Sequence, residues 1–410
     1  MKIQLVKIQT MISVLEATQI IEHHTPKPQS AIKSLSEAAG LVLARDYAAS
    51  EDSPRFTNSA MDGFAVCCED SLSGARLPIM DESSAGSEAQ STLAPRTAIR
   101  ISTGALLPLG ADTIVPVEDC TVENGAITIQ KTPVQGQFVR RQASEYACGA
   151  LILHTGQELT PARVALAAQH GVAAIEVFTP PAVALLSTGN ELVDVSETPA
   201  GTQIRNANVP MLTAAIRQTS VRLVFTAHAE DDFEQVCAAL DKAASAADVV
   251  VTTGGASVGE HDFIKQAAQK LGFETMFWRV RQKPGKPMFF ATRILEGRTT
   301  LLFGLPGNPV STLMTFLYYV RPTLARMMGK STMERCVQAV LSADLANMHG
   351  RAEFVRVRLK YEAGSEIPEA VPLPKQDSNM LTSMTEADGF VFLDIDAAVQ
   401  SGSRVRVVLF

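Results

Sequence analysis

The chain has 410 residues, of which 46% are apolar and 19% charged, and its formal net charge at pH 7 is −7. That length exceeds what one hydrophobic core usually supports, so we expect about three to four folded units. The sequence has one tryptophan, no basic stripe and no apolar run that reaches the ~18 residues of a membrane span, which disfavours nucleic-acid binding and a membrane helix.

The first part of the chain shows three patterns in succession. Apolar residues recur with a helical period up to about residue 47, and residues 48–142 then contain short β-type runs separated by Gly, Pro and acidic turns. Thr160 followed by Pro161 is typical of a helix start. These patterns predict a discontinuous helical linker domain, residues 8–47 with 143–178, and a small β domain inserted into it.

The second half of the chain has two further patterns. Residues 179–330 alternate apolar strands with helical segments, which predicts a doubly wound, three-layer α/β domain. Residues 331–410 alternate apolar and polar residues in short runs, which predicts a C-terminal β-barrel. The fold class that we expect is therefore a multidomain α/β protein with an inserted β domain, a helical linker and a terminal barrel.

Three predicted strands of the α/β domain each run into a glycine-rich turn, at residues 187–191, 252–262 and 304–309. Strand ends of a parallel sheet meet in a crevice, and glycine lets backbone N–H groups approach an oxyanion there. Asn308 and Pro309 have the pattern of a helix cap and first helical residue, which would turn a positive helix end toward the same crevice. Ordinary tight turns are the alternative, but three such loops with polar residues inside favour a binding site.

Acidic residues follow three predicted strands of the α/β domain: Glu191 and Asp262 lie in the first and second glycine loops, and Asp231 and Asp232 follow the strand at residues 222–225. Carboxylate oxygens at successive strand ends suit a hard cation such as magnesium that bridges phosphate oxygens. One of the two adjacent aspartates has a rival role, because an acidic residue before Phe233 is an ordinary helix N-cap. We predict Glu191, Asp231 and Asp262 as metal ligands and leave open which of the adjacent pair acts.

Two lysines, Lys283 and Lys286, lie in a proline-rich turn between the second and third glycine loops. A solvated hairpin tip would explain two lysines if the segment stood alone. Because the whole molecule is negatively charged, an anionic substrate has to be attracted by local cations. The position of the turn therefore favours an anion-binding role.

Several common motifs are missing from the sequence. It contains no G-x-G-x-x-G, no G-x-S-x-G elbow and no H-E-x-x-H, which removes the basis for dinucleotide, serine-hydrolase and zinc-protease interpretations. The six cysteines show no C-x-x-C spacing, and the N-terminus lacks a secretory pattern. We expect a cytoplasmic protein with reduced thiols.

Seven motifs in one order make the sequence resemble the MoeA family, the molybdopterin molybdenumtransferases, which are related to the gephyrin E domain. The motifs occupy residues 58–65, 100–105, 187–192, 254–259, 283–287, 305–310 and 376–380. The resemblance covers nearly the whole chain and implies a MogA-like doubly wound domain.

The resemblance also implies an activity, the last step of molybdenum cofactor synthesis. In that step adenylylated molybdopterin reacts with molybdate in the presence of Mg2+, the metal enters the dithiolene and AMP leaves. Family members are homodimers whose site lies between the α/β domain of one subunit and the inserted β domain of the other. The molybdopterin adenylyltransferase and acceptor molybdoenzymes are then candidate partners.

The residues that the resemblance and the loops together single out fall into two sets. The predicted catalytic residues are Glu191, Asp62, Asp231, Asp262 and Thr103. The predicted substrate-binding residues are Gly254, Gly255, Ser257, Gly259, Lys283, Lys286, Pro306, Gly307, Asn308, Pro309 and Ser378. The dithiolene itself supplies soft sulfur ligands to molybdenum, so no protein cysteine has to take part.

Two alternative functions stay open at this point. A molybdopterin adenylyltransferase shares the doubly wound unit but usually ends its second loop Gly-Gly-Thr-Gly, whereas this chain has Gly254-Gly255-Ala256-Ser257. A non-catalytic, gephyrin-like scaffold would have lost acidic or lysine positions, and none is missing here. Molybdate and tungstate have the same charge and nearly the same shape, so the sequence does not distinguish them.

Overall fold

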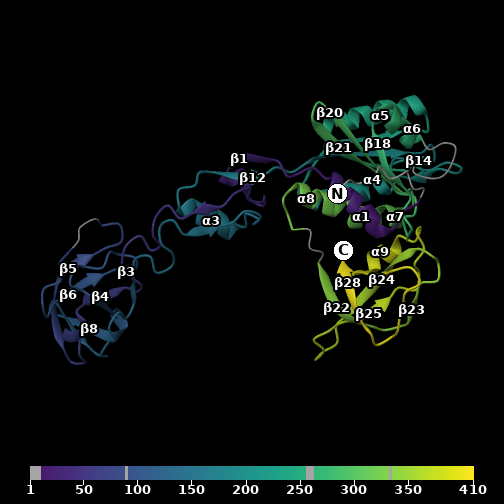
Figure 1. Ribbon diagram of the computed structural model, residues 1–410. Helices are drawn as coiled ribbons and strands as arrows, with labels where there is room; N and C mark the ends of the chain where they lie inside the picture. Colours follow the sequence, from purple (N-terminus) through teal and green to yellow (C-terminus); the bar gives the residue numbers. More distant parts are fainter. Residues whose placement is uncertain (1–10, 88–90, 255–262, 332–334) are drawn as a thin grey trace, which may run out of the picture. The chain divides into compact units, whose positions relative to one another are not determined.

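The computed structural model describes residues 11–87, 91–254, 263–331 and 335–410 (Figure 1). The described chain divides into two compact units, of which the smaller comprises Lys33–Ala39 and Arg45–Ile175. The other described residues form the larger unit. No helix among the described residues combines the length and the apolar character needed to cross a bilayer.

The larger unit is built around a mixed sheet with the strand order β16-β13-β17-β21-β20-β18. The strands are β13 (Ala182–Thr188), β16 (Arg222–Ala229), β17 (Val249–Thr253), β18 (Glu274–Trp278), β20 (Phe289–Leu295) and β21 (Arg298–Leu305). β16, β13, β17 and β21 pair in parallel, whereas β20 pairs antiparallel with both β21 and β18. Every residue of β13 and β17 is buried, as expected for parallel strands covered on both faces.

Helices cover both faces of this sheet. One face carries α1 (Val14–His24), α4 (Asn208–Arg217), α7 (Pro309–Thr315), the π-helical turn η3 (Phe316–Val320) and α8 (Arg321–Met327). The other carries α5 (Phe233–Ala246) and α6 (Phe263–Lys270). Alternation along β13 produces the two cores, because Val183 and Leu185 join the first cluster whereas Ala184 and Leu186 join the second. The predicted three-layer, doubly wound domain is confirmed.

Helix α1 packs on the α/β core. It begins with a capping box at Ser13, and its buried residues Val14 and Ile21 lie in the same apolar cluster as Val183. The predicted linker domain placed this helix with residues 143–178, whereas its apolar face is buried in the larger unit. The other domain boundaries stay predictions.

The C-terminal residues form a closed barrel with the strand order β24-β25-β22-β28-β26, closed by pairing of β24 with β26. The strands are β22 (Cys336–Leu341), β24 (Ala352–Lys360), β25 (Glu369–Pro372), β26 (Gly389–Leu393) and β28 (Arg404–Leu409). Val355 and Val357 point into the barrel, whereas Phe354 and Phe390 pack with the α/β core. The predicted terminal barrel is confirmed.

Short elements complete the larger unit. They are β14 (Leu192–Val193), β15 (Ile204–Arg205), β19 (Gln282–Lys283), β23 (Leu345–Ala346), β27 (Ala398–Val399) and α9 (Thr382–Glu386). β19 pairs in parallel with the start of barrel strand β24. A segment that follows the α/β strand β18 in sequence thus extends the sheet of the barrel.

The smaller unit contains a mixed sheet with the strand order β7-β4-β6-β5-β9-β8. Its elements are α2 (Leu35–Ala38), β2 (Tyr47–Ala48), β3 (Asn58–Ser59), β4 (Gly63–Val66), η1 (Cys68–Asp70), β5 (Arg76–Ser83), β6 (Ala98–Ile101), β7 (Thr113–Pro116), η2 (Val117–Asp119), β8 (Cys120–Glu123), β9 (Ala126–Ile129), β10 (Val139–Arg140), β11 (Leu151–Leu153) and α3 (Pro161–Gln169). Thr160 caps α3 and Pro161 occupies its first turn, as predicted. β1 (Ser30–Ser34) pairs with β12 (Ala174–Phe178) in a separate ladder.

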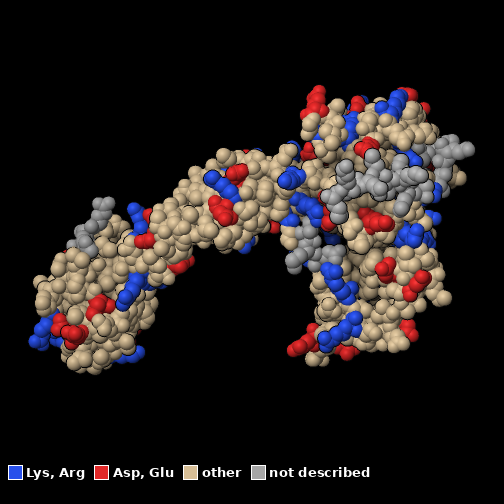
Figure 2. Space-filling view, in the orientation of Figure 1, with Lys and Arg blue, Asp and Glu red and all other residues tan. Residues whose placement is uncertain are grey.

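Charged side chains of both signs are interspersed on the face of the molecule shown in Figure 2. A surface of this kind generates no large field of one sign. Any attraction of an anion on this face therefore depends on particular side chains.

Candidate functional site

The main chains of the glycine loops approach one another closely at the carboxyl ends of β13, β17 and β21. Gly254 has a φ of +86°, and a Cβ built on it would lie 2.3 Å from the carbonyl oxygen of Thr188. A Cβ on Gly307 would lie 3.9 Å from the Cα of Gly254. Since β16 and β17 flank β13 on opposite sides, this is also the switch point of the doubly wound sheet, where such folds bind ligands.

A cavity of about 730 Å³ opens at this point, between the glycine loops and the barrel. Its lining includes Thr188, Glu191, Asn208, Thr253, Gly254, residues 283–287, residues 306–309, Arg351 and residues 376–379. The volume lies in the range of sites for small-molecule ligands and cofactors. Gly254 and Gly307 can line the cavity only with main-chain atoms.

The predicted substrate-binding residues divide into two groups. Those that line the cavity are Gly254, Lys283, Lys286, Pro306, Gly307, Asn308, Pro309 and Ser378. Gly255, Ser257 and Gly259 lie outside the described residues, as does the predicted metal ligand Asp262. Glu191, predicted as both catalytic and metal-binding, lines the cavity.

Asp231 and Asp232 have different surroundings. Asp232 is the N-cap of α5, where its side chain accepts a hydrogen bond from the N–H of Gln235. Asp231 instead bonds the first glycine loop, because its Oδ2 accepts from the Asn190 N–H (3.2 Å) and its own N–H donates to Asn190 Oδ1 (2.9 Å). Asp231 is thus the one of the pair that lies beside the loop of Glu191.

The third loop begins helix α7 as its sequence predicts. Asn308 is the N-cap residue and Pro309 follows it in the first turn, but the Asn308 side chain makes no capping bond. Its Nδ2 donates instead to Ser378 Oγ, at 2.9 Å. The cap residue therefore links the α/β domain to the barrel loop that carries Ser378.

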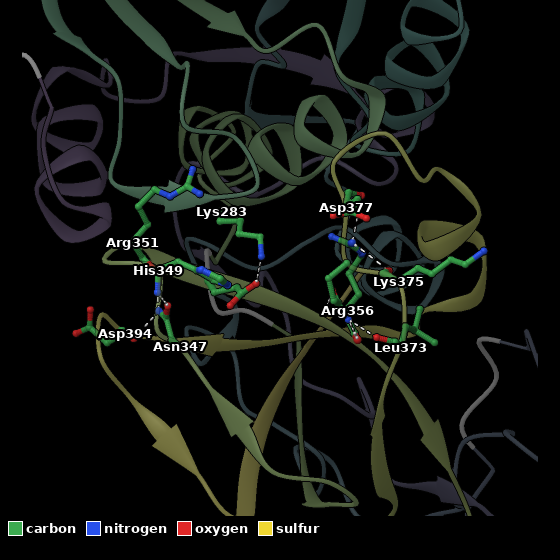
Figure 3. Close-up of polar contacts among 11 residues, drawn as sticks. Lys283, Asn347, His349, Arg351, Arg356, Leu373, Lys375, Asp377 and Asp394 are labelled. Atoms are coloured by element: carbon green, nitrogen blue, oxygen red, sulfur yellow. Dashed lines mark hydrogen bonds and ion pairs between the residues drawn. The ribbon is translucent and has the colours of Figure 1, made fainter.

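Lys283 is already paired. Its Nζ lies 2.9 Å from Glu353 Oε1, and the two side chains are 28% and 11% exposed (Figure 3). The pair follows from the β19–β24 ladder, which sets Lys283 directly beside Glu353. Lys286 and Arg351 are two further cations of the cavity lining, and neither forms an ion pair with another described residue.

Arg351 is a cavity residue that the sequence analysis missed. It lies at the end of the turn at residues 347–351. The side chain of Asn347 stabilises this turn, because its Nδ2 donates to the carbonyl oxygens of Arg351 (2.6 Å) and Asp394 (2.9 Å) (Figure 3). Asn347 is buried, and its Oδ1 accepts from the N–H of His349. No motif marks Arg351, because strand pairing within the barrel brings it to the cavity.

Hydrogen bonds to Arg356 of β24 stabilise the barrel loop that carries Ser378. Gln376 exchanges hydrogen bonds with the main chain of Arg356, accepting from its N–H and donating to its carbonyl oxygen, both at 3.0 Å. The Arg356 side chain is fully buried, and burial lowers the pKa of its guanidinium to about 10. Its Nη2 reaches the carbonyl oxygens of Lys375 (3.4 Å) and Asp377 (3.5 Å) (Figure 3).

Asn208 joins two of the glycine loops and was also missed. From the start of α4, its Nδ2 donates to Thr253 Oγ1 (2.9 Å) and to the carbonyl oxygen of Gly307 (2.7 Å). The donated bonds fix the end of β17 against the third loop. An asparagine at a helix start is common, so sequence alone gives no signal for this contact.

In the smaller unit, the predicted residues Asp62 and Thr103 form a pair. The N–H and Oγ1 of Thr103 both donate to Asp62 Oδ1, at 2.6 and 2.9 Å. The backbone hydrogen bond, followed by the side-chain bond, holds the pKa of the Asp62 carboxyl below its ordinary value. Asp62 is therefore ionised at neutral pH, and among the described residues no side chain or main chain donates to its second carboxylate oxygen.

The acidic residues near the cavity have the donor chemistry of a magnesium site. Glu191 folds over its own loop, where a Cβ on Gly189 would lie 2.6 Å from Glu191 Oε2, and Asp231 approaches the same loop at Asn190. Both supply carboxylate oxygens, the ligands that magnesium prefers. Among the residues that the structure describes, no three His, Cys, Asp or Glu side chains are grouped closely enough to hold a metal ion.

The fold and the cavity define a multidomain α/β protein with a cavity at the switch point of a doubly wound sheet. Three family descriptions match successive parts of this chain. The MoeA N-terminal region (domain I and II) matches residues 12–171, the probable molybdopterin binding domain matches residues 184–326, and the MoeA C-terminal region (domain IV) matches residues 338–410.

Individual relatives match over nearly the full length. The chain is 37% identical to molybdopterin molybdenumtransferase 2 of Mycobacterium tuberculosis (strain ATCC 25618 / H37Rv), over 97% of this chain and 99% of the relative. It is 33% identical to the molybdopterin molybdenumtransferase of Haemophilus influenzae, over 98% and 99%. A solved MoeA protein from Pyrococcus horikoshii matches with a TM-score of 0.80 at 31% identity, over 97% and 99%. The chain belongs to the MoeA family.

Proposed function

We propose that this protein inserts molybdenum from molybdate into adenylylated molybdopterin and releases AMP. Membership of the MoeA family gives it a role in molybdenum cofactor biosynthesis as a transferase. One observation supports the specific proposal: glycine main chain, the carboxylate of Glu191 and two cations that form no ion pair among the described residues, Lys286 and Arg351, line a single cavity. Such a lining combines groups that bind oxyanions with a group that binds a cation.

The oxyanions are held by main chain and by charge. In the proposed complex, the main chain at Gly254 and Gly307 and the first turn of α7 donate to oxygens of the pyrophosphate and of molybdate. Lys286 and Arg351 offset the negative charge. Lys283 contributes less net charge, because Glu353 already compensates it.

Glu191, Asp231 and Asp262 would hold magnesium. When bound, this ion supplies Lewis-acid neutralisation of the charge that develops on the departing adenylate. The bonds between Asp231 and Asn190 keep the loop of Glu191 in place for this role. We propose magnesium as the bound cation because carboxylate oxygens are the ligands that it prefers.

The remaining parts of the proposal concern assembly and location. In a homodimer, Asp62 and Thr103 of one copy would face the cavity of the other and complete the site. The substrate's dithiolene supplies the sulfur ligands of molybdenum, so the cysteines stay out of the reaction. We propose a cytoplasmic location, with the adenylyltransferase that makes the substrate and the molybdoenzymes that accept the product as partners.

The direct test mixes purified protein with adenylylated molybdopterin, magnesium and molybdate, and follows AMP and active cofactor. We expect AMP release that depends on molybdate and magnesium. A parallel reaction with molybdopterin and ATP tests the adenylyltransferase alternative. Release of pyrophosphate there, with no AMP in the first reaction, would replace the proposal by that alternative, and no product in either reaction would favour a scaffold.

A further inference from the structure

The turn that carries the two lysines has a defined shape, set from inside the protein. We call residues 282–287 the lysine loop. The N–H of Val280 donates to the carbonyl oxygen of Lys286 (3.0 Å) and closes the base of this loop. Gly285, at the tip, has a φ of +94°, a conformation that favours glycine.

A buried relay of two side chains holds the tip of the lysine loop. Gln282 is 0% exposed, and its Nε2 donates to the carbonyl oxygen of Gly285 at 3.0 Å. Its Oε1 accepts a hydrogen bond from the hydroxyl of Tyr319, which is 2% exposed. Each polar atom of the Gln282 carboxamide thus has a protein partner in a place without access to bulk water.

The position of Tyr319 depends on an unusual helical turn. Tyr319 lies in the π-helical turn η3, between α7 and α8, and its ring belongs to the core beneath the sheet. Single π-helical turns occur frequently at functional sites. Burial raises the pKa of the Tyr319 phenol well above its ordinary value, so the hydroxyl stays a donor over the whole working pH range.

The lysine loop has little room to move on this side. A Cβ on Gly285 would lie 2.6 Å from Thr315 Cγ2 and 2.8 Å from Gln282 Nε2. On the other side the Lys283–Glu353 ion pair and the β19–β24 ladder tie the loop to the barrel. Lys286 is therefore the exposed lysine of a loop whose main chain is fixed at both of its flanks.

We propose that Gln282 and Tyr319 are positioning residues that set the lysine loop so that Lys286 faces the bound oxyanion. The inference rests on the proposed function, because it takes molybdate as the ligand of this cavity. Neither side chain touches the substrate. Both act through the main chain of Gly285, so their loss affects binding of molybdate more than the chemical step.

The test replaces Tyr319 by Phe, which removes one hydroxyl and leaves Gln282 Oε1 buried without its donor. We expect the KM for molybdate to rise roughly tenfold, with kcat changed less than about twofold. Gln282→Glu keeps the acceptor and loses the donor to Gly285, and we expect a similar shift. Thr323→Val is the matched control, since it removes a buried hydroxyl whose one bond among the described residues is to the carbonyl oxygen of Tyr319, and should leave KM within about twofold.

A double-mutant cycle identifies the group through which the relay acts. In a Lys286→Ala background, Tyr319→Phe should have little further effect on KM. An undiminished effect there, or wild-type KM in both Tyr319→Phe and Gln282→Glu, would overturn the proposal. Calorimetric titration with molybdate alone gives the same comparison without catalysis. The two proposals can fail separately. If the molybdate affinities of the wild type, the variants and the control follow the predicted order but the wild-type protein releases no AMP, the positioning role stands and the proposed function is wrong.

Discussion

The carboxamide of Asn308 donates a 2.9 Å hydrogen bond to the hydroxyl of Ser378. Asn308 is the N-cap residue of α7, but its side chain makes no capping bond to the helix. The contact joins the third glycine loop to the barrel across the cavity. Since both residues also line the cavity, a ligand that fits there touches the α/β domain and the barrel together.

Asn308→Ala should cost the protein little as a helix cap, because no capping bond is lost. We expect a double-mutant cycle of Asn308→Ala with Ser378→Ala to give a coupling energy of about 0.5–1 kcal/mol in the free energy of unfolding. Urea denaturation followed by fluorescence measures it, since the single tryptophan, Trp278, lies in the α/β sheet. Additive effects of the two substitutions would show that the contact contributes nothing in solution.

Glu191→Gln should leave the fold intact and suppress AMP release by at least about 10²-fold, the scale of losing one electrostatic group at a reacting centre. Single-turnover release of AMP from adenylylated molybdopterin measures the effect. Glu197→Gln is a suitable control, because Glu197 is exposed and is not among the residues that line the cavity. Unchanged release kinetics for Glu191→Gln would remove this residue from the mechanism.

The adjacent aspartates should separate activity from stability. Asp232→Ala removes the N-cap bond of α5 and is expected to lower the free energy of unfolding by about 1 kcal/mol with activity largely kept. Asp231→Asn keeps an acceptor for the Asn190 N–H but loses the charge, so we expect near-normal stability and strongly reduced AMP release. Both variants are assayed for the free energy of unfolding and for AMP release. Loss of activity in Asp232→Ala, with loss of stability in Asp231→Asn, would make Asp231 the structural residue and Asp232 the active one.

Gly254→Ala should damage the cavity through a steric clash with Thr188. Gly272 provides the control, since its φ of +81° imposes the same backbone strain but a Cβ there meets nothing within 4 Å. We expect Gly272→Ala to cost about 1–2 kcal/mol in the free energy of unfolding and Gly254→Ala clearly more, with loss of molybdate binding. Equal costs in the denaturation of the two variants would mean that the second loop moves away from Thr188 without penalty.

Thr103→Val should raise the pKa of Asp62 toward its ordinary value, because one of the two hydrogen bonds to the carboxylate is lost. The folded-state pKa is the lowered one, so the stabilisation from this pair is complete above the unfolded pKa. It disappears as the pH falls through the folded-state value. Carboxyl resonances of Asp62, followed by NMR during acid titration, measure the shift, and an identical titration in both proteins would contradict the assignment.

Local patterns in the sequence predicted much of the architecture. The period of apolar residues indicated the strands of the doubly wound sheet, and the turn chemistry at Asn308–Pro309 and Thr160–Pro161 placed two helix starts correctly. Helix α1 was assigned to the wrong body, because periodicity shows that a helix has an apolar face but not what covers that face.

The parts of the cavity that sequence reasoning missed come from long-range contacts. The β19–β24 pairing sets Glu353 beside Lys283 and brings the neighbouring Arg351 to the cavity. Asn208, at the start of α4, donates directly to the carbonyl oxygen of Gly307, which follows β21. Gln282 appears in sequence as one more polar residue before a lysine, and only its burial reveals the relay with Tyr319. The spacing of residues along the chain does not predict such long-range pairings.

β19 follows the α/β strand β18 in sequence but is a strand of the barrel by hydrogen bonding. A chimera that takes its barrel from a relative would therefore also exchange the partner of Lys283, the turn of Arg351 and the loop of Ser378. Under the proposed function, we expect the preference of such a hybrid between one oxyanion and another to follow the barrel, even though the glycine loops belong to the other parent.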